Sequence, residues 1–273
     1  MSTKPSRIRV NGIDIAYCLE GPAAAPVVTF SHSLCADHRM WNAQIAAFTR
    51  RYRVLRLDTR GHGATSAPPG PYNFAMLADD VVGLLDGLGI ERTHFIGLSL
   101  GGMVGQNFAI RHPDRLSRLV LCATAATTPQ PESWDTRIKV AQTKGLAGLA
   151  DATLERWFSD GFRAAAPEVV ARIGQAIRAT PLDGFVGCGQ AIRNLDHRPQ
   201  LAKIGAATLI VVGDDDIGTP VALSEDMNRR IPGSKLVVLP WARHLVNVEL
   251  VEGFNRAKAT SSTRPAPAQG RTG

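Results

Sequence analysis

The chain has 273 residues, of which 44% are hydrophobic and 20% charged, so one large α/β domain fits its length and its composition argues against global disorder. No stretch reaches the roughly 20 apolar residues of a membrane helix, and residues 1–10 lack the apolar core of a signal peptide. The net charge of +7 comes from scattered basic residues rather than from a cluster, which argues against nucleic acid as a partner. We therefore expect a cytoplasmic protein that binds neither membranes nor nucleic acid.

Alternating strands and helices indicate the fold class. Short apolar runs predict strands at 13–19, Val27–Ser31, 54–57, 94–96, 119–121, 209–212 and 236–239. Apolar residues at helical spacing and helix-ending glycine or proline predict helices at 73–88, 101–112, Val221–Arg230 and 249–258. This alternation predicts a mostly parallel sheet flanked by helices.

Between residues 130 and 199 the pattern changes. The segments 138–149, 153–158 and Pro167–Ala179 read as helices, and no strand separates them. We expect a helical cap at 130–199, inserted into a core formed by 1–129 and 200–258. The remaining residues, 259–273, are rich in Ala, Thr, Ser and Pro and predict a disordered tail.

The four cysteines, Cys18, Cys35, Cys122 and Cys188, lie far apart and form no Cys-x-x-Cys pair. This spacing is not that of a zinc site, and disulfides are not expected in a cytoplasmic chain. We expect free and mostly buried thiols. No segment calls for a metal or an organic cofactor.

A Gly-x-Ser-x-Gly pentapeptide at 97–101 places Ser99 between a strand that ends at Ile96 and a helix that begins at Gly101. A serine on such a sharp strand-to-helix turn is a candidate nucleophile, with backbone N–H groups and the helix dipole directed toward developing negative charge. The alternative is a glycine-rich turn with an incidental serine. The strand and helix on either side favour the nucleophile.

A serine nucleophile needs a base, an acid and two oxyanion donors. Among seven histidines, His244 has the best position, in a loop after the strand at 236–239. The acid follows the strand at 209–212 and is one of Asp214, Asp215 and Asp216, which spacing alone does not separate. For the donors we choose the backbone N–H groups of Leu100 and Leu34.

The chain resembles the 3-oxoadipate enol-lactonases, α/β-hydrolases of the bacterial β-ketoadipate route of aromatic breakdown. The motifs that carry this resemblance lie between residues 10 and 254 and are the stretches 57–63, 97–106, 154–158 and 191–196. The family's acid lies in a Gly-x-x-Asp-x-x-Thr-Pro pattern, which selects Asp216, and its histidine lies in a His-Leu-x-Asn-Val-Glu pattern, which matches His244. Related hydrolases commonly have His-Gly where this chain has His32-Ser33.

The resemblance implies that Ser99 attacks a lactone carbonyl, that an enol leaves, and that water then releases the acyl group. Such a substrate carries a carboxylate, so a cationic or hydrogen-bonding group should face it. Our candidates are Trp134, Arg137 and Arg193 in the cap, although cap arginines are usually solvated and a tryptophan can simply pack. Asp58 and Arg60 are expected to brace loops.

Two other readings stay open. The same machinery serves carboxylesterases and lactonases of other specificity, such as acyl-homoserine lactonases, because fold does not determine substrate. A non-catalytic ligand-binding protein with this fold would be favoured by the loss of a triad residue, and none is missing. The sequence does not determine the oligomeric state.

Overall fold

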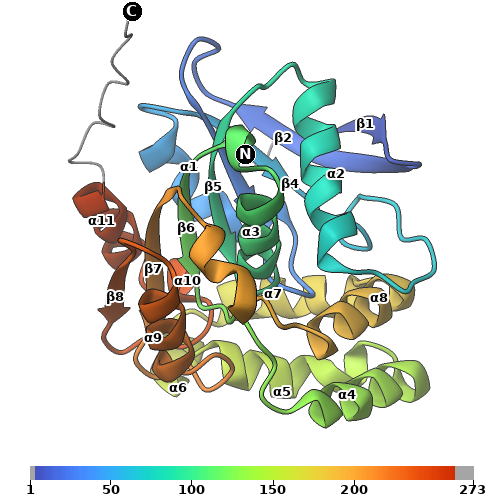
Figure 1. The fold of residues 1–273 in the computed structure, drawn as a ribbon. Coiled ribbons are helices and arrows are strands. Elements are labelled where there is room, and N and C mark those ends of the chain that lie inside the picture. Colours follow the sequence, from blue (N-terminus) through green and yellow to red (C-terminus); the bar gives the residue numbers. More distant parts are fainter. Residues whose placement is uncertain (1–3, 262–273) are drawn as a thin grey trace, which may run out of the picture.

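The structure, a computed structural model, describes residues 4–261, whose centre is one eight-stranded sheet (Figure 1). The strands are β1 (Ser6–Val10), β2 (Ile13–Glu20), β3 (Val27–Ser31), β4 (Arg53–Leu57), β5 (Thr93–Leu98), β6 (Leu116–Cys122), β7 (Ala207–Gly213) and β8 (Lys235–Leu239). They lie side by side in the order β1-β2-β4-β3-β5-β6-β7-β8. Only the pairs β1–β2 and β2–β4 are antiparallel, so the prediction of a mostly parallel sheet is confirmed.

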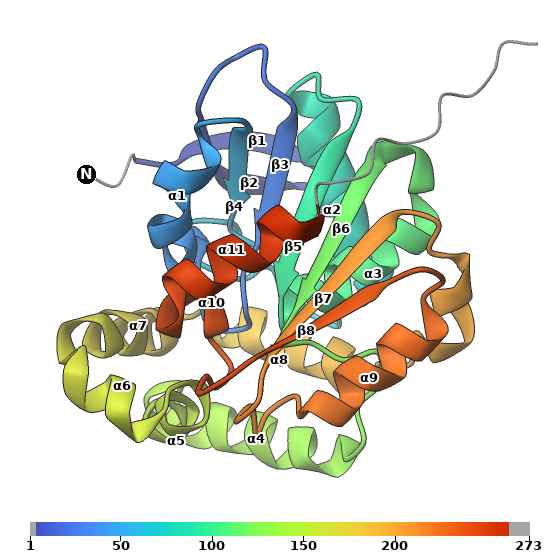
Figure 2. The ribbon, with the colours of Figure 1, turned by 90° about the vertical axis from the view of Figure 1, so that its left-hand side faces the viewer.

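Helices cover both faces of this sheet (Figures 1 and 2). One face carries α2 (Phe74–Gly87), α3 (Leu100–Arg111) and α9 (Val221–Arg230), and the other carries α1 (Asn42–Phe48) and α11 (Val251–Ser261). Shorter helices are η1 (His38–Trp41), η2 (Pro113–Arg115), η3 (Arg198–Lys203) and α10 (Val246–Glu249). Because both faces are covered, β3 and β7 are buried along most of their length, and their sequences are mostly apolar.

Five further helices lie between β6 and β7 in the chain, and we call them the cap. They are α4 (Pro131–Lys144), α5 (Ala147–Trp157), α6 (Asp160–Ala165), α7 (Pro167–Ala179) and α8 (Leu182–Arg193). The cap lies across the carboxyl edge of the parallel strands, at the bottom of Figure 1. That this segment forms a unit with the boundaries 130 and 199 stays a prediction.

Several element boundaries differ from the sequence-based prediction. The helix expected at 138–149 is two helices, because Gly145 adopts a φ of 67° and separates α4 from α5. The last helix, expected at 249–258, is broken into α10 and α11. The tail expected at 259–273 begins as the end of α11, and residues 262–273 lie outside the described residues.

Two smaller expectations concern thiols and membranes. All four cysteines are free and buried, as predicted. Among the described residues, no helix has the length and apolar character needed to cross a bilayer.

The two chain segments that join the cap to the core are fastened to each other and to α3. Thr127 pairs with Asp196 in an isolated β-bridge. His197 follows, donates its backbone N–H to the Ala126 carbonyl at 2.8 Å, and places its Nδ1 3.3 Å from Oε1 of Gln106 on α3. Burial lowers the pKa of His197 from 6.5 to about 4, so this imidazole is neutral at pH 7.

This depressed pKa predicts an acid-sensitive junction. Between pH 6.5 and 4 the unfolded chain binds a proton at His197 that the folded chain does not, so stability present above pH 6.5 is lost as the pH falls through 4. The free energy of unfolding falls between pH 7 and pH 5, and replacing His197 by Gln should make this decrease smaller by about 2 kcal/mol. Urea unfolding of both proteins at the two pH values measures this difference; parallel pH curves would contradict it.

Candidate active site

Four strands end at the sheet edge beneath the cap, and the loops that follow them carry the candidate site residues. Ser99 follows β5, Asp216 follows β7, and His244 lies in the loop after β8. The loop after β3 contains Leu34. Because the carboxyl ends of parallel strands meet at one edge, residues far apart in the sequence come together here.

Ser99 occupies a tight turn between β5 and α3. Its φ of 56° lies in the left-handed region, which is unusual for a residue with a side chain and stores strain that the surroundings must hold. The Ser99 backbone N–H donates to Cys122 at 2.9 Å, and the Thr124 hydroxyl donates to the Ser99 carbonyl at 2.7 Å. A Cβ on Gly101 would lie 2.2 Å from the Ser31 carbonyl oxygen, so this position requires glycine.

The imidazole of His244 is buried and hydrogen-bonded to Asp216. Its Nδ1 lies 2.9 Å from Oδ2 of Asp216, while Oδ1 accepts the backbone N–H groups of Gly218 and Thr219 at 2.8 and 2.9 Å. Burial alone would raise the pKa of Asp216, but His244 and the donors of Thr219 outweigh it and hold that pKa below its usual value. The carboxylate is therefore ionised and directed at the imidazole.

The other two aspartates of this loop have separate partners. Asp214 accepts the backbone N–H of Trp241 at 2.8 Å, and Asp215 accepts Nε of Arg243 at 2.8 Å. Both bonds hold the loop that carries His244, and neither carboxylate contacts the imidazole in the part of the chain described. Of the three aspartates that spacing did not separate, Asp216 is thus the one that contacts His244.

A second buried histidine, His32, holds the loop after β3. The Thr59 backbone N–H donates to its Nε2 at 2.9 Å, so the ring proton lies on Nδ1, which donates to the Ser33 carbonyl at 2.7 Å. The Ala36 backbone N–H donates to the same carbonyl at 3.0 Å. In a trans peptide the C=O and the following N–H point in opposite directions. Fixing the Ser33 carbonyl therefore also fixes the direction of the Leu34 N–H.

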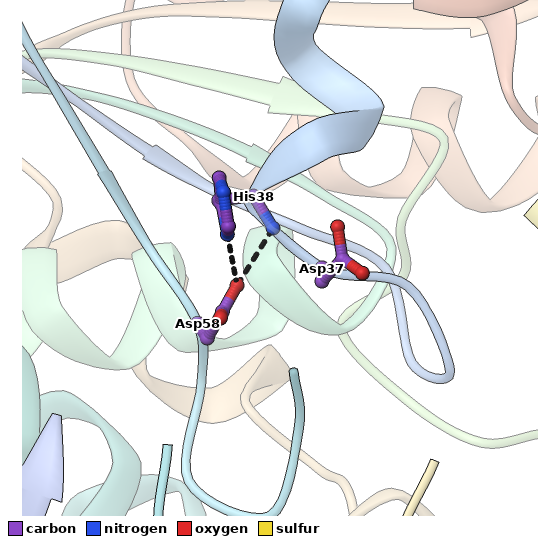
Figure 3. Close-up of side chains that lie close together, drawn as sticks. All are labelled: Asp37, His38 and Asp58. Carbon is purple, nitrogen blue, oxygen red and sulfur yellow. Dashed lines mark hydrogen bonds and ion pairs between the residues drawn. The ribbon is translucent and has the colours of Figure 1, made fainter. Parts of the chain in front are cut away.

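Next to this loop, Asp37, His38 and Asp58 form a buried cluster (Figure 3). Oδ1 of Asp58 accepts both the backbone N–H and Nδ1 of His38 at 2.8 Å, and Oδ2 accepts Ala64 at 2.9 Å. Burial opposes ionisation of Asp58, but His38 and these donors lower its pKa to about 2. Asp37 pairs with Arg39 through both oxygens. With all four carboxylate oxygens accepting protein hydrogen bonds, the cluster fits a brace for the loop better than a metal site.

Ser99 and His244 line one small cavity, about 120 Å³ in volume, between the core and the cap. Leu34 also lines it. Among residues 4–261 the backbone N–H groups of Leu34 and Leu100 have no hydrogen-bond acceptor. Trp157 from α5 stacks over the His244 ring at a centroid distance of 6.2 Å and closes that side of the cavity.

The three candidate cap residues have different positions. Trp134 and Arg137 line the cavity, and the Arg137 guanidinium lies 4.1 Å from the centre of the Trp134 ring. Arg193 does not join them, because Nε and Nη2 donate to the two oxygens of Asp135 at 2.6 and 3.0 Å on the surface. Arg60 pairs with Asp80 and acts as a brace, as expected.

One further arginine of the cavity wall, Arg156, was missed in the sequence. It belongs to the stretch 154–158, which the sequence analysis used only as a family motif. The sequence does not show that its neighbour Trp157 stacks on His244, which brings this end of α5 to the cavity. An amphipathic reading of α5 would have directed attention to it.

Known proteins are similar to this chain over most of its length. A sequence profile of the alpha/beta hydrolase fold matches residues 26–249. A 3-oxoadipate enol-lactonase of Acinetobacter baylyi is 37% identical over 90% of this chain and 91% of that protein. The crystal structure of the enol-lactonase from Burkholderia xenovorans has a TM-score of 0.92 and 38% identity, over 95% of this chain and 100% of that one.

A third relative is described as a putative carbamate hydrolase from a Caulobacter species, with 31% identity over 87% of this chain and 91% of that protein. The similarity to 3-oxoadipate enol-lactonases inferred from the motifs is thus confirmed. The profile match covers far more than half of the chain and agrees with the observed sheet and its flanking helices. The chain therefore belongs to the α/β-hydrolase fold family.

Proposed function

We propose that this hydrolase opens a short lactone that carries a carboxylate, and that 3-oxoadipate enol-lactone, an intermediate of aromatic degradation, is that substrate. The observation that carries the proposal is the guanidinium of Arg137, which lines the same cavity as Ser99 and His244. Its Nε is buried with no hydrogen-bond partner. No carboxylate among the described side chains forms an ion pair with it, so the cavity offers an unpaired cation to an anionic substrate.

The reaction would begin with attack of the Ser99 hydroxyl oxygen on the ring carbonyl. Asp216 holds Nδ1 of His244, so Nε2 is left to take the hydroxyl proton. Collapse of the tetrahedral intermediate breaks the ring C–O bond, and the enol oxygen leaves with the proton from the imidazolium. The enol then becomes a ketone, and a water deprotonated by His244 hydrolyses the acyl-enzyme and restores Ser99.

The negative charge on the tetrahedral oxygen would be bound by the N–H groups of Leu34 and Leu100. The Leu100 donor stands at the N-terminal end of α3, where the helix dipole also favours negative charge. The Leu34 donor depends on the loop that His32 holds. We assign His32 as a positioning residue, because its Nδ1–H holds the Ser33 carbonyl away from the reacting oxygen.

The size of the cavity supports a short substrate. A volume of about 120 Å³ is well below the roughly 300–1,000 Å³ of pockets that bind drug-sized ligands. A long acyl chain therefore finds little room between the core and the cap. This disfavours the acyl-homoserine lactonase reading, while a neutral short-chain carboxylesterase stays the alternative that the following test distinguishes.

The first test follows the loss of enol-lactone absorbance with wild-type protein and Ser99→Ala. We expect the variant to lose at least about 10⁴-fold in kcat, because removing a triad nucleophile removes the acyl-enzyme route. Ser133→Ala is the matched control, since Ser133 is exposed on α4 and does not line the cavity, and it should keep most of the activity. If the protein hydrolysed neutral aryl esters but not the enol-lactone, the proposed triad would be kept and the proposed substrate would be refuted.

A second test addresses the loop. His32→Ala should lower kcat by about 10²–10³-fold, the effect of losing one oxyanion donor, with little change in KM. The concentration of active serines is measured by titration with a covalent inhibitor, so that kcat is calculated for folded protein alone. His32→Gln offers one donor and one acceptor and should restore part of the rate. A normal kcat per titrated serine in His32→Ala would show that the loop holds its direction without this side chain.

A further inference from the structure

Arg137 and Arg156 differ from most described arginines in forming no ion pair with a described carboxylate. Even exposed arginines form ion pairs here, as Arg178 does with Asp151 at 2.7 Å and Arg198 with Asp196 at 2.8 Å. Among the side chains that the structure describes, no carboxylate pairs with either arginine of the cavity. The buried Arg60 is paired as well, with Asp80 at 2.7 Å, so Arg137 and Arg156 stand out as arginines of a cavity wall that form no ion pair with a described side chain.

The two cations stand on neighbouring cap helices, Arg137 on α4 and Arg156 on α5, and both line the cavity that contains Ser99. Burial lowers the pKa of Arg137 to about 10, and the charge of Arg156 adds to this shift. Burial also lowers the pKa of Arg156, and the charge of Glu155, which forms no ion pair with it, opposes this shift only in part. Both stay protonated at neutral pH and repel each other. The one hydrogen bond of the Arg156 guanidinium to a described residue is a long one of 3.3 Å to the Thr153 hydroxyl.

We propose that Arg156 and Arg137 form a two-cation site for short dicarboxylates. The proposal rests on the proposed function for its biological reading, since hydrolysis of a lactone that carries one carboxylate produces a second. The substrate carries one negative charge, while the site carries the two positive charges of the arginines. Attack on the carbonyl adds a negative charge on the oxygen, and the ring-opened product carries two carboxylates. The site therefore matches the charge of the later states better than that of the substrate.

Two consequences follow. A short dicarboxylate should bind more tightly than a molecule of the same length with one charge, and such dicarboxylates should inhibit the enzyme. Two unpaired cations in a small cavity also destabilise the empty protein, because each loses hydration without gaining a counter-ion. Removing Arg156 should then stabilise the fold while weakening dianion binding. An arginine with a purely structural role would give the opposite sign for stability.

The experiment measures by calorimetry, at constant ionic strength, the Kd of adipate and of its half-amide, adipamate, which differ in one charge and contain no ester bond. We expect wild-type protein to bind adipate at least about tenfold more tightly, corresponding to about 1.4 kcal/mol. Arg156→Met should lose this preference and should unfold at a higher urea concentration. Arg172→Met is the matched control, because Arg172 is exposed on α7 and removes the same net charge away from the cavity.

Equal affinities for the two ligands in wild-type protein, or a preference that survives in Arg156→Met, would overturn the proposal. The measurement needs no turnover, so it is independent of the substrate. Preference for adipate without hydrolysis of the enol-lactone would keep the two-cation site and refute the proposed function. Hydrolysis of the enol-lactone without a preference for adipate would keep the proposed function and refute the two-cation site.

Discussion

The turn at Ser99 is the constraint on which the rest of this site depends. A side chain held at a φ of 56° needs surroundings that leave it no alternative. Those surroundings come from three strands. Ser99 itself follows β5, and its backbone N–H donates to the carbonyl of Cys122, the last residue of β6. The Gly101 N–H donates to the carbonyl of His32, just after β3, at 3.1 Å. The same bonds that hold the strained turn thereby fix the serine relative to the loop that contains Leu34.

The cap is tied to this core through the loop that carries the candidate base. The Arg243 guanidinium donates to the Glu155 carbonyl on α5 at 2.7 Å, and its backbone N–H donates to Glu249 at 2.7 Å. The other oxygen of Glu249 accepts the Ser159 backbone N–H at 2.9 Å. Because Arg243 precedes His244, the C-terminal end of α5 has a fixed position relative to the imidazole. The part of the cavity wall that Arg156 and Trp157 form is therefore attached to the loop that carries His244.

Strand β1 and helix α1 were not predicted. The rest of the sheet, the helices α2, α3 and α9, and the strand ends that carry Ser99, Asp216 and His244 could be predicted from the sequence, because buried parallel strands are rich in apolar residues and the motifs follow them directly. Helix α8 could not, since Gly184, Gly187 and Gly189 lower helix propensity. The structure shows the reason for the first: a Cβ on Gly184 would lie 1.9 Å from the Gly61 carbonyl oxygen. Close packing between distant segments leaves no local signal.

The surroundings of the cap arginines could not be predicted from the sequence for a related reason. Whether an arginine is solvated, paired or aimed into a cavity depends on which acidic side chain lies near it in space. Arg193 has Asp135 within reach, 58 positions away in the sequence, while Arg137 and Arg156 have no such partner among the described side chains. The sequence offered Arg137 and Arg193 as equal candidates and did not single out Arg156, because it does not show which acidic side chains lie near each arginine.

The division between core and cap then bears on substrate choice. The proposed nucleophile, base, acid and oxyanion donors all belong to the core, in loops after its strands and at the first residue of α3, whereas the two arginines belong to α4 and α5. Replacing two cap residues could change the charge of the preferred substrate without moving the catalytic groups, which is how one fold serves many reactions. Similarity over about 90% of the chain therefore speaks for the fold and the hydrolytic chemistry more strongly than for the substrate. The proposal of an anionic substrate therefore rests on the two guanidinium groups in the cavity wall that form no ion pair with a described side chain.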